Sequence, residues 1–174
     1  MNATGGTTPT PTQTPRPGRY TIDPDGSALS FRTTHVFGLL PVRGTFALRG
    51  GTVDVADPLS GSRIGAEVDA ASFRSGNAQR DGAVRSARFL DTGTHPLITF
   101  VSAEVGADAV SGTLTAHGVS RPVRLSVVRL DVLADAFTVR ATLRVDRTEF
   151  GVTASPGMAG RRLELTVVAR CVRA

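Results

Sequence analysis

The feature that most constrains this chain is an alternation of apolar and polar residues that recurs along most of its length. The clearest example has apolar side chains at Phe137, Val139, Ala141, Leu143 and Val145. Residues 163–171 repeat the pattern. Successive side chains of a β-strand point to opposite faces, so a period of two indicates strands with one dry and one wet face. Such strands are typical of antiparallel sheets and not of a parallel sheet covered by helices.

The same alternation, interrupted at hairpin-length spacing by turn residues, predicts about eight or nine strands. We expect a turn at residues 23–26, which read Asp-Pro-Asp-Gly, and a hairpin turn at Gly50-Gly51. The expected strands cover residues 20–22, 27–35, 43–55 in two parts, 63–71, 97–105, 110–116, 119–132, 137–145 and 163–171.

Period alone does not distinguish a closed barrel from a two-sheet sandwich. Small residues are frequent on the dry side of the strands: Ala66, Ala70, Ala116, Ala141 and Ala169. A barrel of about eight strands either fills its interior with side chains or holds one small ligand. Small inward residues leave room for the ligand. We therefore predict an all-β fold, an extended antiparallel β-barrel of about eight strands.

One segment departs from the strand pattern and predicts a short helix near one end of the barrel. Residues 77–90 are rich in Ala, Arg and Gln, which favour helices, whereas Gly82 weakens the helix. Residues 91–96 then read as a loop that returns the chain to an extended conformation, since Pro96 disfavours helix at the residue before it. A helical insert here would lie across or beside the barrel mouth.

The N-terminal residues 1–18 contain no apolar run, so we predict a disordered tail followed by one barrel domain, residues 19–174. The tail lacks the apolar middle of a secretory signal, and no later segment has the apolar length of a membrane span. We expect a cytoplasmic location, or an exported one if a leader was removed. The single cysteine, Cys171, excludes an internal disulfide.

The net charge is +5. The chain contains no lysine, so arginine supplies all of its positive side-chain charge. The arginines are dispersed, mostly at the polar positions of the expected strands. This distribution favours a solvated outer surface over a nucleic-acid interface, so no nucleic-acid partner is expected.

Candidate binding residues are mainly apolar, and each has a structural alternative. His35 shares a strand face with Phe31 and could meet a polar head group, or be a hydrogen-bonded structural residue. Arg80, next to Asp81, could grip a pyrophosphate or carboxylate, or tie the helix to the barrel as an ion pair; Arg147 is similar. The phenylalanines could line a lipid cavity or fill the core. The predicted ligand-binding set is Leu29, Phe31, His35, Phe46, Leu48, Phe73, Arg80, Val84, Phe89, Phe100, Val139, Leu143 and Phe150.

The three histidines have no metal-binding spacing, and no nucleophile-elbow or phosphate-loop motif is present, so no cofactor, metal or catalytic residue is predicted.

From residue 20 onward the chain resembles the YceI family, lipocalin-like barrels associated with polyisoprenoid binding. Five segments carry the resemblance in order: Tyr20-Thr21-Ile22-Asp23; His35 to Leu39 with Val42 to Phe46; Arg80-Asp81 with Arg85-Ser86, Phe89, Asp91 and His95 to Phe100; Gly112 to Thr115 with Gly118 to Ser120; and Arg147 to Val152. The resemblance implies a long apolar cavity and raises a homodimer as a hypothesis, because members are often dimeric.

Three functions follow as hypotheses. The first is non-catalytic binding of a long apolar ligand of isoprenoid, quinone or fatty-acyl type, and it is preferred. The second is a cyclase-like or isomerase-like enzyme that uses the same cavity. The third is a barrel filled by its own side chains that acts only through its surface.

Overall fold

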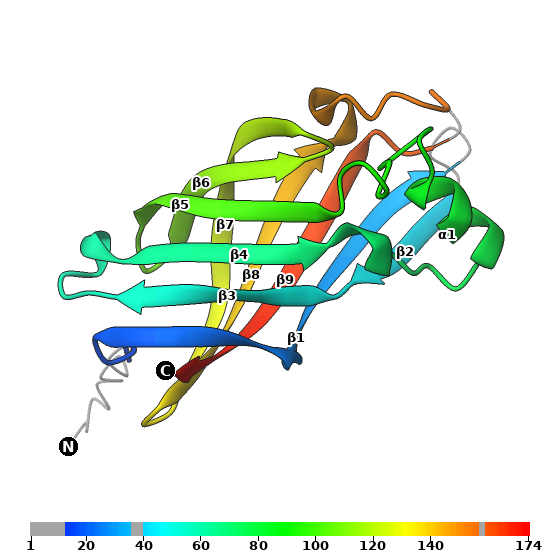
Figure 1. Cartoon of the computed structure of the whole chain (residues 1–174). Helices are drawn as coiled ribbons and strands as arrows, with labels where there is room; N and C mark the ends of the chain where they lie inside the picture. Colours follow the sequence, from blue (N-terminus) through cyan, green and yellow to red (C-terminus); the bar gives the residue numbers. More distant parts are fainter. Residues whose placement is uncertain (1–12, 36–39, 157–158) are drawn as a thin grey trace, which may run out of the picture.

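The computed structural model describes residues 13–35, 40–156 and 159–174 and shows a single antiparallel sheet closed into a barrel (Figure 1). The described strands run in the order β2-β1-β3-β4-β5-β6-β7-β8-β9, and β1 also pairs with β9. β2 and β3 occupy one place beside β1, so the closed antiparallel barrel has eight strands, as predicted. The strand bounds are β1 Gly18–His35, β2 Leu40–Phe46, β3 Leu48–Val55, β4 Arg63–Asp69, β5 Leu97–Val105, β6 Ala109–Ala116, β7 Val119–Val132, β8 Ala136–Asp146 and β9 Arg162–Arg173.

The predicted turn at residues 23–26 is wrong, because these residues lie within β1. Pairing of β1 with β9 shifts register between Asp23 and Ala28, which marks an irregularity in a continuous strand. Asp23 accepts a bond from the side chain of Arg170 on β9 at 2.8 Å, so the bulged segment stays tied to its neighbour. Bulges of this kind bend a strand and increase its twist, which helps a sheet to close.

The predicted hairpin turn at Gly50-Gly51 is also wrong, because both glycines lie inside β3. Their φ angles are +154° and +155°, values that L side chains rarely adopt. Register between β3 and β4 shifts between Leu48 and Gly50, so this stretch is a bulge in which the strand bends. Glycine inside a strand often marks such a bend at a barrel corner.

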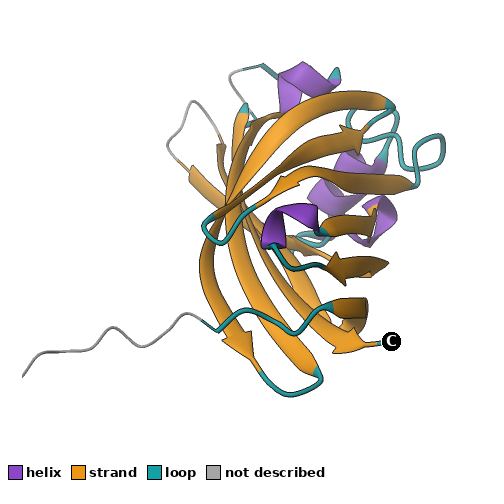
Figure 2. Cartoon of the chain, turned by 90° about the vertical axis from the view of Figure 1, so that its left-hand side faces the viewer, coloured by secondary structure: helices purple, strands orange, loops and turns teal. Residues whose placement is uncertain are grey.

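The predicted short helix is present as α1, Ala78–Arg85, at one end of the barrel (Figure 1). The side chain of Asn77 accepts the backbone N–H of Arg80 at 3.0 Å and so caps the first turn. Three 3₁₀ turns complete the described helices: η1 Leu59–Gly61, η2 Ala70–Ser72 and η3 Arg147–Phe150. Figure 2 shows the strands curving round a common interior.

The N-terminal segment is described from residue 13, and residues 1–12 of the predicted tail lie outside the described residues. Pro15 is buried, and the carbonyl of Arg16 accepts the hydroxyl of Tyr20 at 2.8 Å. Residues 14–17 therefore contact the barrel. No helix in the described part of the chain is long and apolar enough to span a membrane.

Candidate ligand-binding cavity

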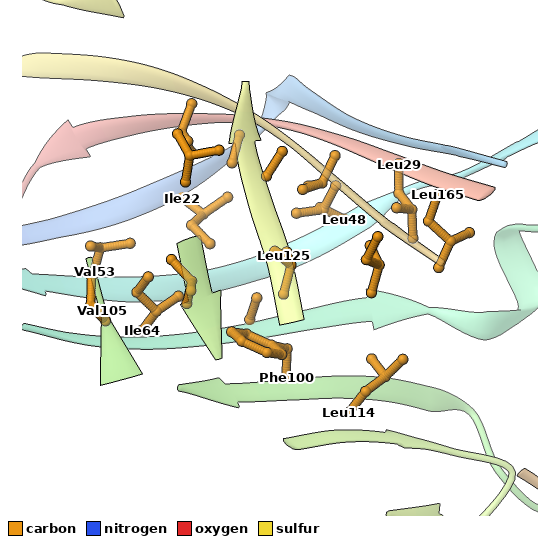
Figure 3. A pocket seen from close by; sticks show the side chains of 18 of the residues that line it. Ile22, Leu29, Leu48, Val53, Ile64, Phe100, Val105, Leu114, Leu125 and Leu165 are labelled. Atoms are coloured by element: carbon orange, nitrogen blue, oxygen red, sulfur yellow. The ribbon is translucent and has the colours of Figure 1, made fainter. Parts of the chain in front are cut away.

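The barrel encloses an apolar cavity of about 440 Å³ (Figure 3). Pockets that hold small ligands are commonly about 300–1,000 Å³. All nine described strands contribute side chains, most of them through alternate residues. Figure 3 shows these side chains converging from strands that face one another, among them Ile22, Leu48, Phe100, Leu114 and Leu165.

Small residues and half-buried apolar residues together keep the interior open. Of the five small residues expected to face inward, four line the cavity, namely Ala66, Ala116, Ala141 and Ala169, whereas Ala70 is buried in η2 and does not. Leu114 and Leu125 also line it, and both are only partly buried although they face the barrel interior. Apolar surface that stays exposed inside the barrel offers a binding site for an apolar ligand.

The structure brings part of the predicted binding set together in this cavity. The members that line it come from β1, β2, β3, β5, β8 and η3: Leu29, Phe46, Leu48, Phe100, Val139, Leu143 and Phe150. The structure shows that these residues lie in the cavity wall. Their contact with a ligand stays a prediction.

Three other members of the set, Phe31, Phe73 and Val84, form a separate cluster that does not line the cavity. The rings of Phe31 and Phe73 stack at 5.0 Å between centroids, and Phe46 meets Phe73 edge-on at 5.3 Å. Phe46 belongs to both groups, so the cluster closes the cavity at the end that lies beneath α1. Aromatic pairs in these geometries add about 0.5–1.5 kcal/mol each beyond the area that they bury.

The remaining members of the set lie away from the cavity or outside the described side chains. Arg80 lies in α1 and reaches the hydroxyl of Ser75 at 3.5 Å. The alternative reading, an ion pair that ties the helix to the barrel, is not found, because neither Arg80 nor Asp81 forms an ion pair with the described residues. Asp81 is buried and accepts the backbone N–H and hydroxyl of Ser75 instead. Phe89 is half-buried outside the cavity. The side chain of His35 lies outside the described residues.

Arg147 is a cavity residue that the predicted set omitted. It is 8% exposed, and its guanidinium donates to the backbone carbonyls of Gly160, Val152 and Ala159 at 2.8, 2.8 and 3.2 Å. Its carbon Cζ lies 5.7 Å from the ring centroid of Phe89. Burial lowers the pKa of Arg147, and the neighbouring carboxylate of Asp146 opposes that change. No carboxylate forms an ion pair with Arg147 within the described residues.

The opposite end of the cavity carries most of its other polar groups. The described residues there include Thr14, Pro15, Ser62, Asp108 and Arg129. The hydroxyl of Ser62 is buried and accepts the backbone N–H of Ala56 at 2.9 Å. Sequence patterns gave no signal for Thr14 and Pro15, because a Thr/Pro-rich segment lacks the apolar period that indicates packing.

Cys171 also lines the cavity and is fully buried on β9. Burial raises the pKa of its thiol to about 12, because a thiolate would lose its hydration there. Within the described residues, no three or more His, Cys, Asp or Glu side chains are placed to hold a metal ion.

Comparison with known proteins decides the family. The family model described as "YceI-like domain" matches residues 20–171. The chain belongs to the YceI-like family. A UPF0312 protein of Pectobacterium carotovorum is 30% identical over 167 residues, 88% of this chain and 86% of that protein. A UPF0312 protein of Serratia proteamaculans is 32% identical over 168 residues, 89% of this chain and 86% of that protein.

Two solved structures are similar to this YceI-like chain in fold. BcnA of Burkholderia cenocepacia has a TM-score of 0.74 at 20% identity, covering 86% of this chain and 98% of that one. A polyisoprenoid-binding domain from Saccharophagus degradans has a TM-score of 0.71 at 18% identity, covering 89% of this chain and 98% of that one. Identities this low support the YceI-like fold alone.

Proposed function

We propose that this protein binds one long apolar molecule, such as an isoprenoid, quinone or fatty-acyl chain, inside its barrel. The observation that carries the proposal is the cavity of about 440 Å³ with an almost wholly apolar wall. The family, and the polyisoprenoid-binding description of the similar domain from Saccharophagus degradans, support the same class of ligand.

Burial of the chain supplies the binding free energy in this mechanism. An apolar chain that loses about 400 Å² of accessible surface gains roughly 10 kcal/mol at ~25 cal/mol per Å². Immobilising the ligand opposes this gain by about 4 kcal/mol or more. The balance of at most about 6 kcal/mol corresponds to a Kd of about 40 μM or weaker. This affinity needs no directional contacts, which agrees with a wall of Leu, Val, Ile, Phe and Ala side chains.

Native mass spectrometry before and after organic extraction tests the proposal. We expect purified protein to carry an apolar molecule that extraction removes, and stripped protein to regain mass when a prenol or fatty acid is added. Stripped protein that takes up neither compound, while its circular dichroism shows an intact barrel, would contradict the proposal.

A further inference from the structure

The barrel wall has a gap between β7 and β8. The two strands pair from Val132↔Phe137 to Ser126↔Thr142, and their pairing ends there. Beyond that point residues 119–125 of β7 pair with β6, and residues 143–146 of β8 pair with β9. Figure 1 shows β7 and β8 leaving their hairpin together and then separating, β7 beside β6 and β8 beside β9.

A hollow of about 710 Å³ occupies this gap. Its lining residues come from β7 and β8 at and beyond the Ser126↔Thr142 pair, from β9 and from η3. Leu143, Val145, Phe150 and Leu165 line both this hollow and the cavity inside the barrel. The outer hollow and the inner cavity are therefore separated at the gap by these side chains.

Two hydrogen bonds bound the gap at its far end and form its frame. They join η3 to β7 and to the turn that precedes β7. The Nε–H of Arg121 donates to the carbonyl of Glu149 at 3.0 Å. The Nδ1–H of His117 donates to the carbonyl of Phe150, also at 3.0 Å. The ladder at Ser126↔Thr142 closes the near end. The gap is thus a bounded window in the wall.

Two arginines of β7 at the rim have donors to spare. Arg121 uses only Nε in a hydrogen bond, and Arg124 forms no ion pair or side-chain hydrogen bond with the described residues. Of the rim carboxylates, Glu164 pairs with Arg144 at 3.2 Å and Asp146 with Arg161 at 2.5 Å, which leaves Glu149 unpaired among the described residues. Guanidinium donors favour an anionic group at such a rim.

We propose that the window between β7 and β8 is a side entrance to the cavity, and that it takes an amphiphile with an acidic head. The apolar chain passes between Val123 and Val145 into the barrel, and the head stays at the rim with Arg121 and Arg124. This inference rests on the proposed function, because it assigns a route and a head group to the same apolar ligand.

Tying the two strands together tests the route. In one variant, Arg124→Cys and Arg144→Cys are joined across the window by a bifunctional maleimide. In the control, Asp131→Cys and Thr138→Cys, which face each other in the paired ladder, are joined by the same reagent. Uptake of cis-parinaric acid, a fatty acid that fluoresces in apolar surroundings, is timed before and after crosslinking. Thermal unfolding shows that each crosslinked sample is folded.

We expect the crosslink across the window to slow uptake by about tenfold or more, and the control crosslink to leave the rate unchanged, since access to a buried site limits association. Equal rates with the window tied and free would overturn the entrance. Protein that takes up no probe in any form would contradict the proposed function itself.

Competition by hexadecanoic acid and hexadecanol, which have the same chain, tests the head group. We expect the unmodified protein to bind the acid about tenfold more tightly, and Arg124→Gln, which breaks no contact of the frame, to lose most of that preference while binding the alcohol as before. Equal affinity of the unmodified protein for acid and alcohol would overturn the acidic-head assignment and leave the proposed function standing.

Discussion

Cys171 is a side chain whose chemistry depends on the cavity around it. With the pKa of the thiol raised to about 12, only about one molecule in ten thousand is a thiolate at pH 8. We expect Ellman's reagent at pH 8 to leave the folded protein unlabelled for hours and to label one thiol at once in urea. Rapid labelling of the folded protein would show that the wall at β9 opens to water.

Asp146 carries a pH-dependent part of the stability. The Thr148 hydroxyl, the Thr148 backbone N–H and the Arg161 guanidinium donate to its carboxylate and hold its pKa below the ordinary value of 3.8. A lowered folded pKa means that the contribution is present above 3.8 and is lost as pH falls through the folded value. We expect the free energy of unfolding of Asp146→Asn to lie below that of the unmodified protein at pH 6.

That difference should shrink as pH falls below 4, because the unmodified carboxyl is then protonated too. Urea denaturation at several pH values measures it. Glu104→Gln is the control, since Glu104 is exposed and its carboxyl has no hydrogen bond or ion pair within the described residues. A difference for Asp146→Asn that stays constant from pH 6 to pH 2 would mean that the carboxylate charge does not stabilise the fold.

The bend in β3 depends on Gly51. A Cβ at this position would overlap the carbonyl oxygen of Gly65, and φ is +155°. We expect Gly51→Ala to lower the free energy of unfolding by about 2 kcal/mol or more, because both strain and a clash oppose it. Gly65→Ala, on the adjacent strand with open space around its Cβ, should change stability by less than about 0.5 kcal/mol. A similar decrease in the free energy of unfolding of both variants would mean that alanine destabilises the strands in general and not the bend in particular.

The elements themselves were mostly predictable, because alternation depends only on which side chains face the interior. The alternation correctly indicated strands from β4 to β9. It failed at residues 23–26 and at Gly50-Gly51, where turn-forming residues serve as bulges inside long bent strands. Local sequence cannot distinguish these uses, since a bulge is defined by the register of the neighbouring strand.

The sequence predicted which residues of the binding set face the barrel interior. It did not predict how far along the barrel axis each of them lies. Phe31 shares the inward side of β1 with Leu29, yet it stacks on Phe73 and closes one end, whereas Leu29 lines the cavity. An alternation with a period of two indicates which face of the sheet a side chain occupies, and not its position along the barrel. Arg147 was left out of the set because its burial depends on the backbone carbonyls of residues 152–160, which no side-chain pattern records.

The barrel as a whole gives up packing to keep its interior open. Protein interiors are normally filled to the density of organic crystals. Larger apolar side chains in place of the inward alanines would fill the space and raise the free energy of unfolding. Ala66 on β4 is the most useful position to examine, because it lines the cavity, is only partly buried and lies opposite Phe100 in the β5 register.

We expect Ala66→Leu to raise the free energy of unfolding by about 0.5–2 kcal/mol and to weaken binding of an apolar ligand by about tenfold, because the new side chain takes the space of the ligand. Glu67→Leu is the matched control: it adds the same side chain to the next residue, which is exposed on the outer face. It should leave the affinity unchanged. Thermal unfolding and ligand titration measure both effects. Unchanged affinity in Ala66→Leu would place the ligand elsewhere on the molecule, because a chain inside the barrel has to lie against β4.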